Sequence, residues 1–373
     1  RGEVDKAIQA CTRYLSLYPS DTETLERLGI LLDEKAATGP GLLRAYMTFE
    51  TVLRQDAGRD KVRLRLVDVA IKLGRYSDAL AHIAILKRAS ATDADLIFKE
   101  GVCNEKSGKI REAARLYSES IAYEEAKIEY FTRLARLVLQ PNADLDLKEI
   151  DPLKRDNADG SQVAAEIMKN AVDKCRPRHL ALLARASFLQ SQGKIDDAEK
   201  DIKESLELAE DDTDVLLAAA QLALEQADIA ATTGQTADAA QYRETATGYA
   251  RRGFERDLRL YFILARVLVD TGKRSEAIAL LREVIAKNPS DENAIFNLGF
   301  LSIQSGQHAK AVERFEKLIK MNERNWKAHL YLGISQQALG KQENAVKEFE
   351  LVAKNTKDLD LKAQAEQLIE EKN

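Results

Sequence analysis

The chain has 373 residues, of which 45% are hydrophobic and 31% are charged, a balance that excludes an intrinsically disordered protein. Its formal net charge of −5 at pH 7 is modest and argues against nucleic acid as a partner. No run approaches the ~18 consecutive apolar residues of a transmembrane helix, so we predict no membrane contact within this segment. Three widely separated cysteines predict neither a disulfide framework nor a zinc site.

One pattern of small and large residues recurs along the chain. Six glycines, here called turn glycines, are each followed five residues later by an alanine: Gly74, Gly108, Gly193, Gly272, Gly306 and Gly340. Nine residues after each turn glycine is a large position, occupied by Ile83, Tyr117, Ile202, Leu281, Phe315 and Phe349. Seven residues before each turn glycine is a position here called the small position. It holds glycine or alanine in every repeat except the first of these six, which has valine: Val67, Gly101, Ala186, Ala265, Gly299 and Gly333.

Helix packing explains these positions. A glycine between two helices adopts the left-handed conformation that ends the first helix. A small residue lets two helix backbones approach closely, and a large side chain fills the space beside it. Because one such helix pair cannot bury its own apolar face, the pattern predicts a stack of helix pairs.

In chain order, the pattern predicts a leading half-repeat at 2–18, nine full repeats and a capping helix over about 359–371. It is interrupted by inserts near 36–42, 141–160 and 228–238. We expect the polar insert at 141–160 to be mobile, since its Asp, Asn and Pro residues cannot bury a core. The whole of 1–373 is predicted to be a single domain. The sequence opens inside a repeat, so it leaves the cellular compartment open.

The repeating pattern resembles that of the tetratricopeptide repeat family. The residues that carry the resemblance are Leu298-Gly299, Gly306, Ala311 and Phe315, and then Trp326, Leu332-Gly333, Gly340, Ala345 and Phe349. The resemblance implies an all-α fold, a right-handed superhelical solenoid of antiparallel helix pairs. It also implies that the first helix of each pair lines a concave groove.

No constellation of residues in the sequence indicates catalysis. The four histidines stand singly, and no HExxH motif, Ser-His-Asp ordering or phosphate-binding glycine loop occurs. We therefore predict a protein that is not an enzyme and that has no catalytic residues, no cofactor and no metal site. His329 occupies a position at which the family has a packed residue in the first helix, so we expect it to be a core or groove residue.

The insert contains a partial match to a calcium-binding loop. With Gly160 in the sixth place, Asn157, Asp159 and Glu166 fall in the third, fifth and twelfth places. The first place would then hold Arg155, a cation where a carboxylate is required. We therefore interpret the match as a coincidence.

Two sets of residues are candidates for partner binding. In the family, the residue two before the small position faces the groove, and toward the N-terminus this row is basic: Arg27, Arg65, Lys99 and Arg133. The row predicts an acidic partner segment. Acidic residues four positions earlier, such as Asp95 before Lys99, leave open the alternative that these are paired helix-surface charges.

Toward the C-terminus the corresponding columns are rich in aromatic and apolar residues. The candidates there are Phe262, Arg266, Phe296, Asn297, Phe300, Lys327, Tyr331 and Ile334. They predict a groove for an apolar stretch of an extended or helical segment. Of the five positions that form a carboxylate clamp in chaperone-tail-binding members of the family, only Asn297 and Lys327 match, which argues against that function.

We predict a non-catalytic scaffold or adaptor that binds a protein segment in its groove. One alternative is a structural spacer within a larger polypeptide. Another is an accessory arm of a polypeptide whose remaining part is enzymatic or membrane-anchored.

Overall fold

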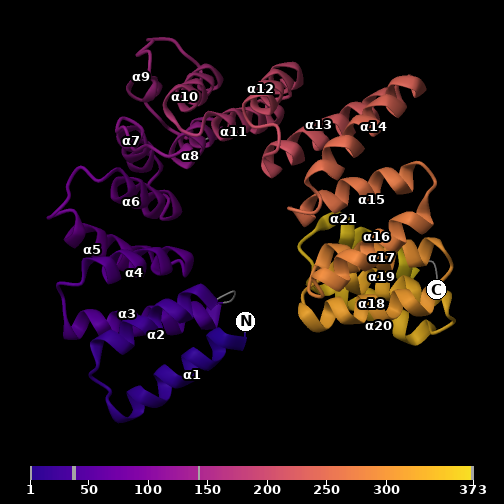
Figure 1. Cartoon of the computed structure of the whole chain (residues 1–373), viewed down its shortest axis with the longest axis horizontal. Coiled ribbons are helices and arrows are strands. Elements are labelled where there is room, and N and C mark those ends of the chain that lie inside the picture. The colour runs from indigo at the N-terminus through magenta and orange to yellow at the C-terminus, as the bar shows by residue number, and fades with distance from the viewer. Residues whose placement is uncertain (1, 36–38, 142, 371–373) are drawn as a thin grey trace. The chain divides into compact units, whose positions relative to one another are not determined.

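The computed structural model describes residues 2–35, 39–141 and 143–370. These residues form α-helices and one short 3-10 helix, with no strand among them (Figure 1). The chain divides into two compact units, residues 1–201 and 202–373, which we describe separately. The predicted single domain over 1–373 therefore stays a prediction.

Unit 1 begins with successive helices that pack against their neighbours in sequence. They are α1 (Gly2–Leu17), α2 (Thr22–Lys35), α3 (Gly39–Gln55), α4 (Asp60–Lys72), α5 (Tyr76–Leu86), α6 (Ala94–Lys106), α7 (Ile110–Ser120), α8 (Ile128–Val138), α9 (Leu147–Ile150), α10 (Gly160–Lys174) and α11 (Arg178–Ser191). Helix α12 (Ile195–Leu208) contains the boundary between the units. The predicted insert near 36–42 lies partly outside the described residues and otherwise falls in the first turn of α3.

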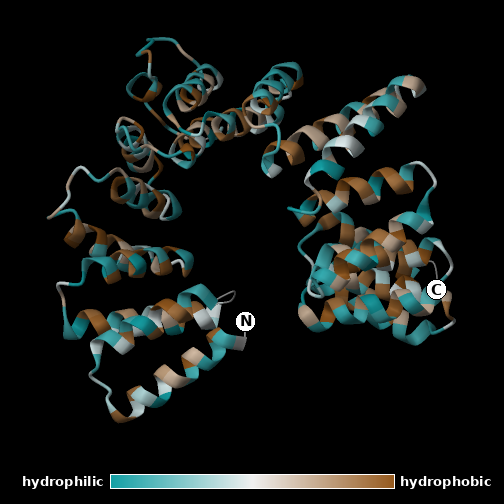
Figure 2. Ribbon diagram, in the orientation of Figure 1, coloured by the Kyte–Doolittle hydropathy of each residue, from teal (hydrophilic) through white to brown (hydrophobic). Residues whose placement is uncertain are grey.

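Unit 2 continues the helix pairs. It comprises α13 (Thr213–Thr232), α14 (Thr236–Gly253), the 3-10 helix η1 (Leu258–Leu260), α15 (Tyr261–Asp270), α16 (Arg274–Lys287), α17 (Glu292–Gln304), α18 (His308–Met321), α19 (Trp326–Ala338), α20 (Gln342–Asn355) and α21 (Leu359–Glu370). Helix α21 occupies the range assigned to the capping helix and packs on α20. Apolar segments concentrate where α16 to α20 face one another (Figure 2).

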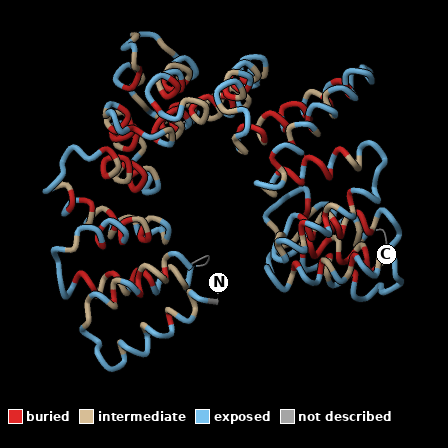
Figure 3. Tube along the Cα trace, in the orientation of Figure 1, coloured by how far each residue is buried: buried red, intermediate tan, exposed pale blue. Residues whose placement is uncertain are grey.

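The small and large positions make the contacts that the sequence pattern predicts. A Cβ atom placed on Gly101 would lie 2.6 Å from the ring of Tyr117, and one on Gly333 would lie 2.4 Å from the ring of Phe349. Both rings are fully buried. The turn glycines have positive φ, as at Gly306 (68°), where the backbone leaves α17. The buried segments lie along the helices, while most of the connections are exposed (Figure 3).

Residues 143–160 of the insert contribute to the packed interior of unit 1, so the expectation that the insert cannot bury a core is wrong. Ile150, in the short helix α9, belongs to the same buried apolar cluster as α8 and α10. Asp151 is fully buried, and its carboxylate accepts hydrogen bonds from the backbone N–H groups of Leu153 and Arg155, both at 3.1 Å. The Arg155 side chain also donates to it, from Nε at 2.8 Å. The prediction from polar composition failed because hydrogen bonds within this segment pair its polar groups, which allows them to be buried.

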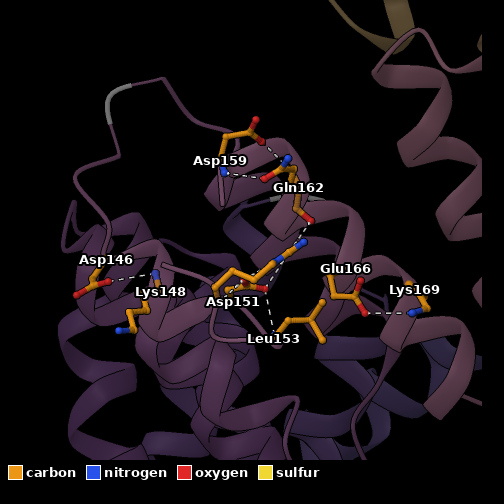
Figure 4. A network of polar contacts seen from close by, with 9 residues as sticks. Asp146, Lys148, Asp151, Leu153, Asp159, Gln162, Glu166 and Lys169 are labelled. Carbon is orange, nitrogen blue, oxygen red and sulfur yellow. Dashed lines mark hydrogen bonds and ion pairs between the residues drawn. The ribbon is translucent and has the colours of Figure 1, made fainter. Parts of the chain in front are cut away.

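The residues of the apparent calcium loop have other roles. Arg155 pairs with Asp151, and Asp159 caps helix α10 by accepting from the backbone N–H of Gln162 at 2.8 Å. Glu166 lies within α10 and pairs with Lys169 at 3.3 Å (Figure 4). Across the described residues, no group of three or more His, Cys, Asp or Glu side chains is placed to hold a metal ion.

We expect Asp151→Ala to destabilise unit 1 by about 1–3 kcal/mol, because two backbone N–H groups and Arg155 would lose their buried acceptor. Arg155 lowers the pKa of Asp151 to about 2, so this contribution is present above the usual carboxyl pKa and is lost as the pH falls toward 2. Hydrogen exchange of α9 and α10 at neutral pH measures the effect. The matched control, Asp156→Ala, removes an exposed pair with Lys148 and should change little.

Helix α13 bears on the expectation that no segment could cross a membrane. Its length and composition would allow it to cross a membrane, although no long uninterrupted apolar run occurs. A search for consecutive apolar residues did not detect this helix because Asp214, Glu225 and Asp228 interrupt its apolar sequence. In unit 2 it is a core helix: Ala220, Leu224 and their neighbours pack against α14 and α15.

His329 and Arg63 are buried polar residues at the same place in the repeat, four residues before the small position. His329 Nδ1 lies 2.6 Å from a carboxylate oxygen of Glu348, and Nε2 lies 3.1 Å from the carbonyl oxygen of Glu323. Arg63 bonds to His82 at 3.2 Å and to the carbonyl of Ala57 at 2.6 Å, with the same sequence separations. The expectation of a packed histidine is confirmed, since His329 is only 5% exposed.

The His329 contacts predict a pH dependence. Burial alone would lower the pKa of His329, but the hydrogen bonds to Glu348 and to the Glu323 carbonyl raise it overall. A raised folded-state pKa contributes stability that is fully present below the unfolded pKa of ~6.5 and is lost as the pH rises through the folded pKa. We expect unit 2 to be more stable at pH ~6 than at pH ~8.5, and His329→Gln to reduce that difference. An unchanged difference in denaturant midpoints would contradict this role.

Candidate functional site

The residues predicted to bind a partner all lie on the first helices of their repeats. Arg27, Arg65, Lys99 and Arg133 lie on α2, α4, α6 and α8 in unit 1. The C-terminal candidates lie on three helices of unit 2: Phe262 and Arg266 on α15; Phe296, Asn297 and Phe300 on α17; and Lys327, Tyr331 and Ile334 on α19.

Most of the basic row of unit 1 is neutralised by ion pairs between successive first helices. Lys99 Nζ lies 2.8 Å from carboxylate oxygens of both Asp68 on α4 and Asp95 on α6. Burial alone would lower the pKa of Lys99, but these two carboxylates raise it overall, so the pair stays charged. The pairing of Asp95 with Lys99 confirms one of the helix-surface pairs considered in the sequence analysis.

The other members of the row differ in how tightly they are held. Arg133 Nη1 lies 3.0 Å from Glu105 on α6, and Arg65 Nη1 lies 3.9 Å from Asp33 on α2. Arg27 is exposed and makes no ion pair within the described part of the chain. The row therefore joins neighbouring repeats more than it presents free positive charge.

Four of the C-terminal candidates meet around one cavity of about 170 Å³, here called the C-terminal pocket: Phe262, Arg266, Asn297 and Phe300. Ala265, Leu281 and Leu301 add apolar surface between α15, α16 and α17. The Phe262 side chain is 47% exposed, which is unusual for a phenylalanine in a packed repeat. The pocket thus joins apolar walls to an open aromatic ring.

The polar groups at the pocket are of two kinds. Arg266 Nη2 lies 2.5 Å from Asp228 on α13 and its Nε lies 3.8 Å from Asp270, so its charge is balanced within the unit. The Asn297 side chain has no hydrogen-bond partner among the described residues, and the same holds for Gln304. The pocket can therefore offer neutral amide donors and acceptors to a peptide backbone.

The remaining C-terminal candidates support the pocket or lie beyond it. Tyr331 contacts Phe300 edge-on at 5.5 Å and Phe296 edge-on at 5.4 Å, which fixes the side of α17 that carries Asn297. Ile334 is partly buried against the cluster of α19, α20 and α21. Lys327 is exposed on α19 and does not line the pocket.

Sequence reasoning missed Val269, Gln304 and Asp228. Val269 and Gln304 lie one helical turn after Ala265 and Phe300, so the three-to-four-residue spacing of a helix face would have identified them. Asp228 reaches Arg266 only because α13 is longer than the other first helices, and the sequence pattern left its register uncertain.

Turn glycines, small-on-large contacts and paired helices together define an α-helical repeat protein. Residues 258–301 and 301–359 each match a tetratricopeptide repeat family model. Residues 258–359 of unit 2 are therefore tetratricopeptide repeats, and the rest of the chain continues the same pattern of helix pairs. Such repeats generally bind protein or peptide partners and are not catalytic, so the chain is in general terms a protein–protein interaction scaffold.

Solved structures with a similar arrangement share little sequence with this chain. Yeast Tom70 is 16% identical, with 99% of this chain and 92% of that chain covered and a TM-score of 0.44. YrrB, described as a TPR protein with an unusual peptide-binding site, is 19% identical over 54% of this chain and 99% of its own, with a TM-score of 0.37. MamA from Desulfovibrio magneticus RS-1 is 18% identical, with 45% of this chain and 84% of that chain covered and a TM-score of 0.36. No curated protein gave a significant match.

Proposed function

We propose that the chain is a non-catalytic adaptor that holds an apolar stretch of a partner protein in the C-terminal pocket. The observation that carries the proposal is the exposed ring of Phe262 beside a cavity with mainly apolar walls. Burying a large apolar side chain there would contribute about 1.5–3 kcal/mol to binding. The cavity has room for one such side chain, which makes it an anchor site.

The polar groups favour an uncharged stretch over a charged terminus. Arg266 is already balanced by Asp228 and Asp270, and Lys327 lies outside the pocket, so a terminal carboxylate has no free cation at the anchor site. Asn297 and Gln304 can instead pair with backbone amides on either side of the anchor residue. The partner segment is therefore expected to bind through its interior.

We do not extend the proposal to an acidic partner segment along unit 1. Lys99 and Arg133 are held by carboxylates of the preceding repeat, so an acidic ligand would have to displace them. Their arrangement supports a structural role in which the ion pairs join successive repeats. Unit 1 then resembles the spacer that was the alternative interpretation.

Selection of a random peptide library against the full chain tests the proposed function. We expect enriched peptides to share one large apolar residue and to bind equally with a free or an amidated C-terminus. Enrichment that depends on a free carboxylate would contradict the anchor mechanism. Absence of any enriched peptide would favour the spacer interpretation for the whole chain.

A further inference from the structure

Unit 2 has a second groove, on the opposite side of α15 from the C-terminal pocket. Its volume is about 540 Å³, and its floor consists of Leu264, Val267 and Leu268 from α15 and Leu280 from α16. Residues two positions apart on a helix point about 200° apart, so Leu264 and Phe262 face different sides. We call this cavity the α14–α16 groove.

The apolar floor is a departure from the rest of the repeat pattern. Leu268 lies three residues after the small position and Leu280 lies fifteen residues after it. The other five regularly spaced repeats have at least one polar residue at these two positions: Ala70 and His82, Asn104 and Leu116, Leu189 and Asp201, Ser302 and Arg314, Gln336 and Glu348. In the next repeat Arg314 donates to Ser302 Oγ at 2.7 Å, so polar groups occupy the space that is open and apolar here.

The shape of the groove suits a row of side chains from a helix. Its wall on α14 is formed by Ala240, Arg243, Thr247 and Arg251, which recur at spacings of three and four residues on one face. Those residues span about 16 Å at ~1.5 Å per residue, which corresponds to three helical turns. The side chains of Ala240 on α14 and Ala279 on α16 are small, so the backbone of another helix can approach the groove closely from either side.

Charges of both signs line the walls, since three carboxylates, Glu244, Glu276 and Glu283, stand beside three basic residues. Arg243, Arg251 and Lys273 line the groove and make no ion pair within the part of the chain that the structure describes. Arg243 Nε is, in addition, buried without a hydrogen-bond partner.

The carboxylates of the walls are partly compensated. Glu283 pairs with Lys287 at 2.8 Å, and Glu276 lies in the first turn of α16, where the helix N-terminus favours a negative charge. Glu244 is exposed and unpaired among the described residues. A ligand carboxylate beside Arg243 would supply the missing counter-charge.

We propose that the α14–α16 groove docks an amphipathic helix of a partner protein. The apolar stripe of that helix lies on Leu264, Leu268 and Leu280, and an acidic residue on its flank pairs with Arg243. This site is separate from the C-terminal pocket, so the scaffold has two binding surfaces on opposite sides of α15.

Two synthetic helical peptides of about 18 residues test the proposal, measured by fluorescence anisotropy with the full chain. Both have leucines at helical i, i+3, i+4 and i+7 spacing and blocked termini. One has glutamates beside the stripe, and the other has lysines in the same places. We expect the glutamate peptide to bind at least ~10-fold more tightly, and Arg243→Gln to remove most of that preference.

The double variant Leu268→Ser with Leu280→Arg copies the residues of the next repeat, so it should fold and lose binding of the glutamate peptide. Phe262→Ala, in the C-terminal pocket, should bind this peptide as the unchanged chain does. Equal affinities for the two peptides, or full binding by the double variant, would overturn the proposal. Loss of binding in Phe262→Ala would instead assign the peptide to the C-terminal pocket and would also overturn it.

Discussion

Gly333→Ala should destabilise unit 2 in the native background and stabilise it when Phe349 is shortened. The added Cβ atom would lie 2.4 Å from Cε1 of Phe349, whose ring is fully buried and cannot move aside. Overpacking of this kind typically costs about 1–3 kcal/mol. Alanine is favoured over glycine inside a helix by ~1 kcal/mol, which offsets only part of that cost.

A double-mutant cycle with Phe349→Leu isolates the contact. In the Phe349→Leu background the clash is relieved, so Gly333→Ala should raise the free energy of unfolding by up to ~1 kcal/mol. The matched control is Gly248→Ala in α14, where the added Cβ meets nothing within 4 Å and should be stabilising in both backgrounds. Additive effects of Gly333→Ala and Phe349→Leu would show that the small and large positions do not act together.

The second large effect concerns binding. Phe262→Ala should weaken the affinity for peptides selected in the C-terminal pocket by ~10-fold or more, since it removes an exposed aromatic wall of the anchor site. The fold should be unaffected, because the ring is 47% exposed and little packing is lost. Isothermal titration with one selected peptide measures the change.

The matched control is Leu351→Ala on α20. Leu351 is 39% exposed and lies outside the pocket, so its removal should change the affinity less than twofold. Equal losses in the two variants would mean that general surface hydrophobicity, and not the pocket, binds the peptides.

Much of the fold could be predicted from the sequence because its contacts are local. The turn glycines, the small positions and the large positions lie within a single repeat, so their spacing alone predicts contacts such as that of Gly333 with Phe349. Four of the partner-binding candidates line the C-terminal pocket, because successive first helices present equivalent positions, and their binding role stays a prediction. The packed His329 follows from the same register.

The features that were not predicted depend on contacts between side chains that have no fixed spacing in the sequence. The sequence did not predict that Lys99 reaches back to Asp68 in the preceding repeat, since only pairs within one helix have a fixed spacing. The buried Asp151 was missed because a polar segment can satisfy its carboxylate through its own backbone and Arg155. The α14–α16 groove was missed because Leu268 and Leu280 are typical core residues in sequence, and only the structure shows that they stay partly exposed in a groove.

Hydrogen–deuterium exchange of the full chain with and without a selected peptide tests the central claim most directly. If the C-terminal pocket holds the partner segment, slowed exchange should appear in α15 and α17, and Phe262→Ala should abolish it at the same peptide concentration. Protection confined to unit 1, or protection of α15 and α17 that persists in Phe262→Ala, would contradict the claim.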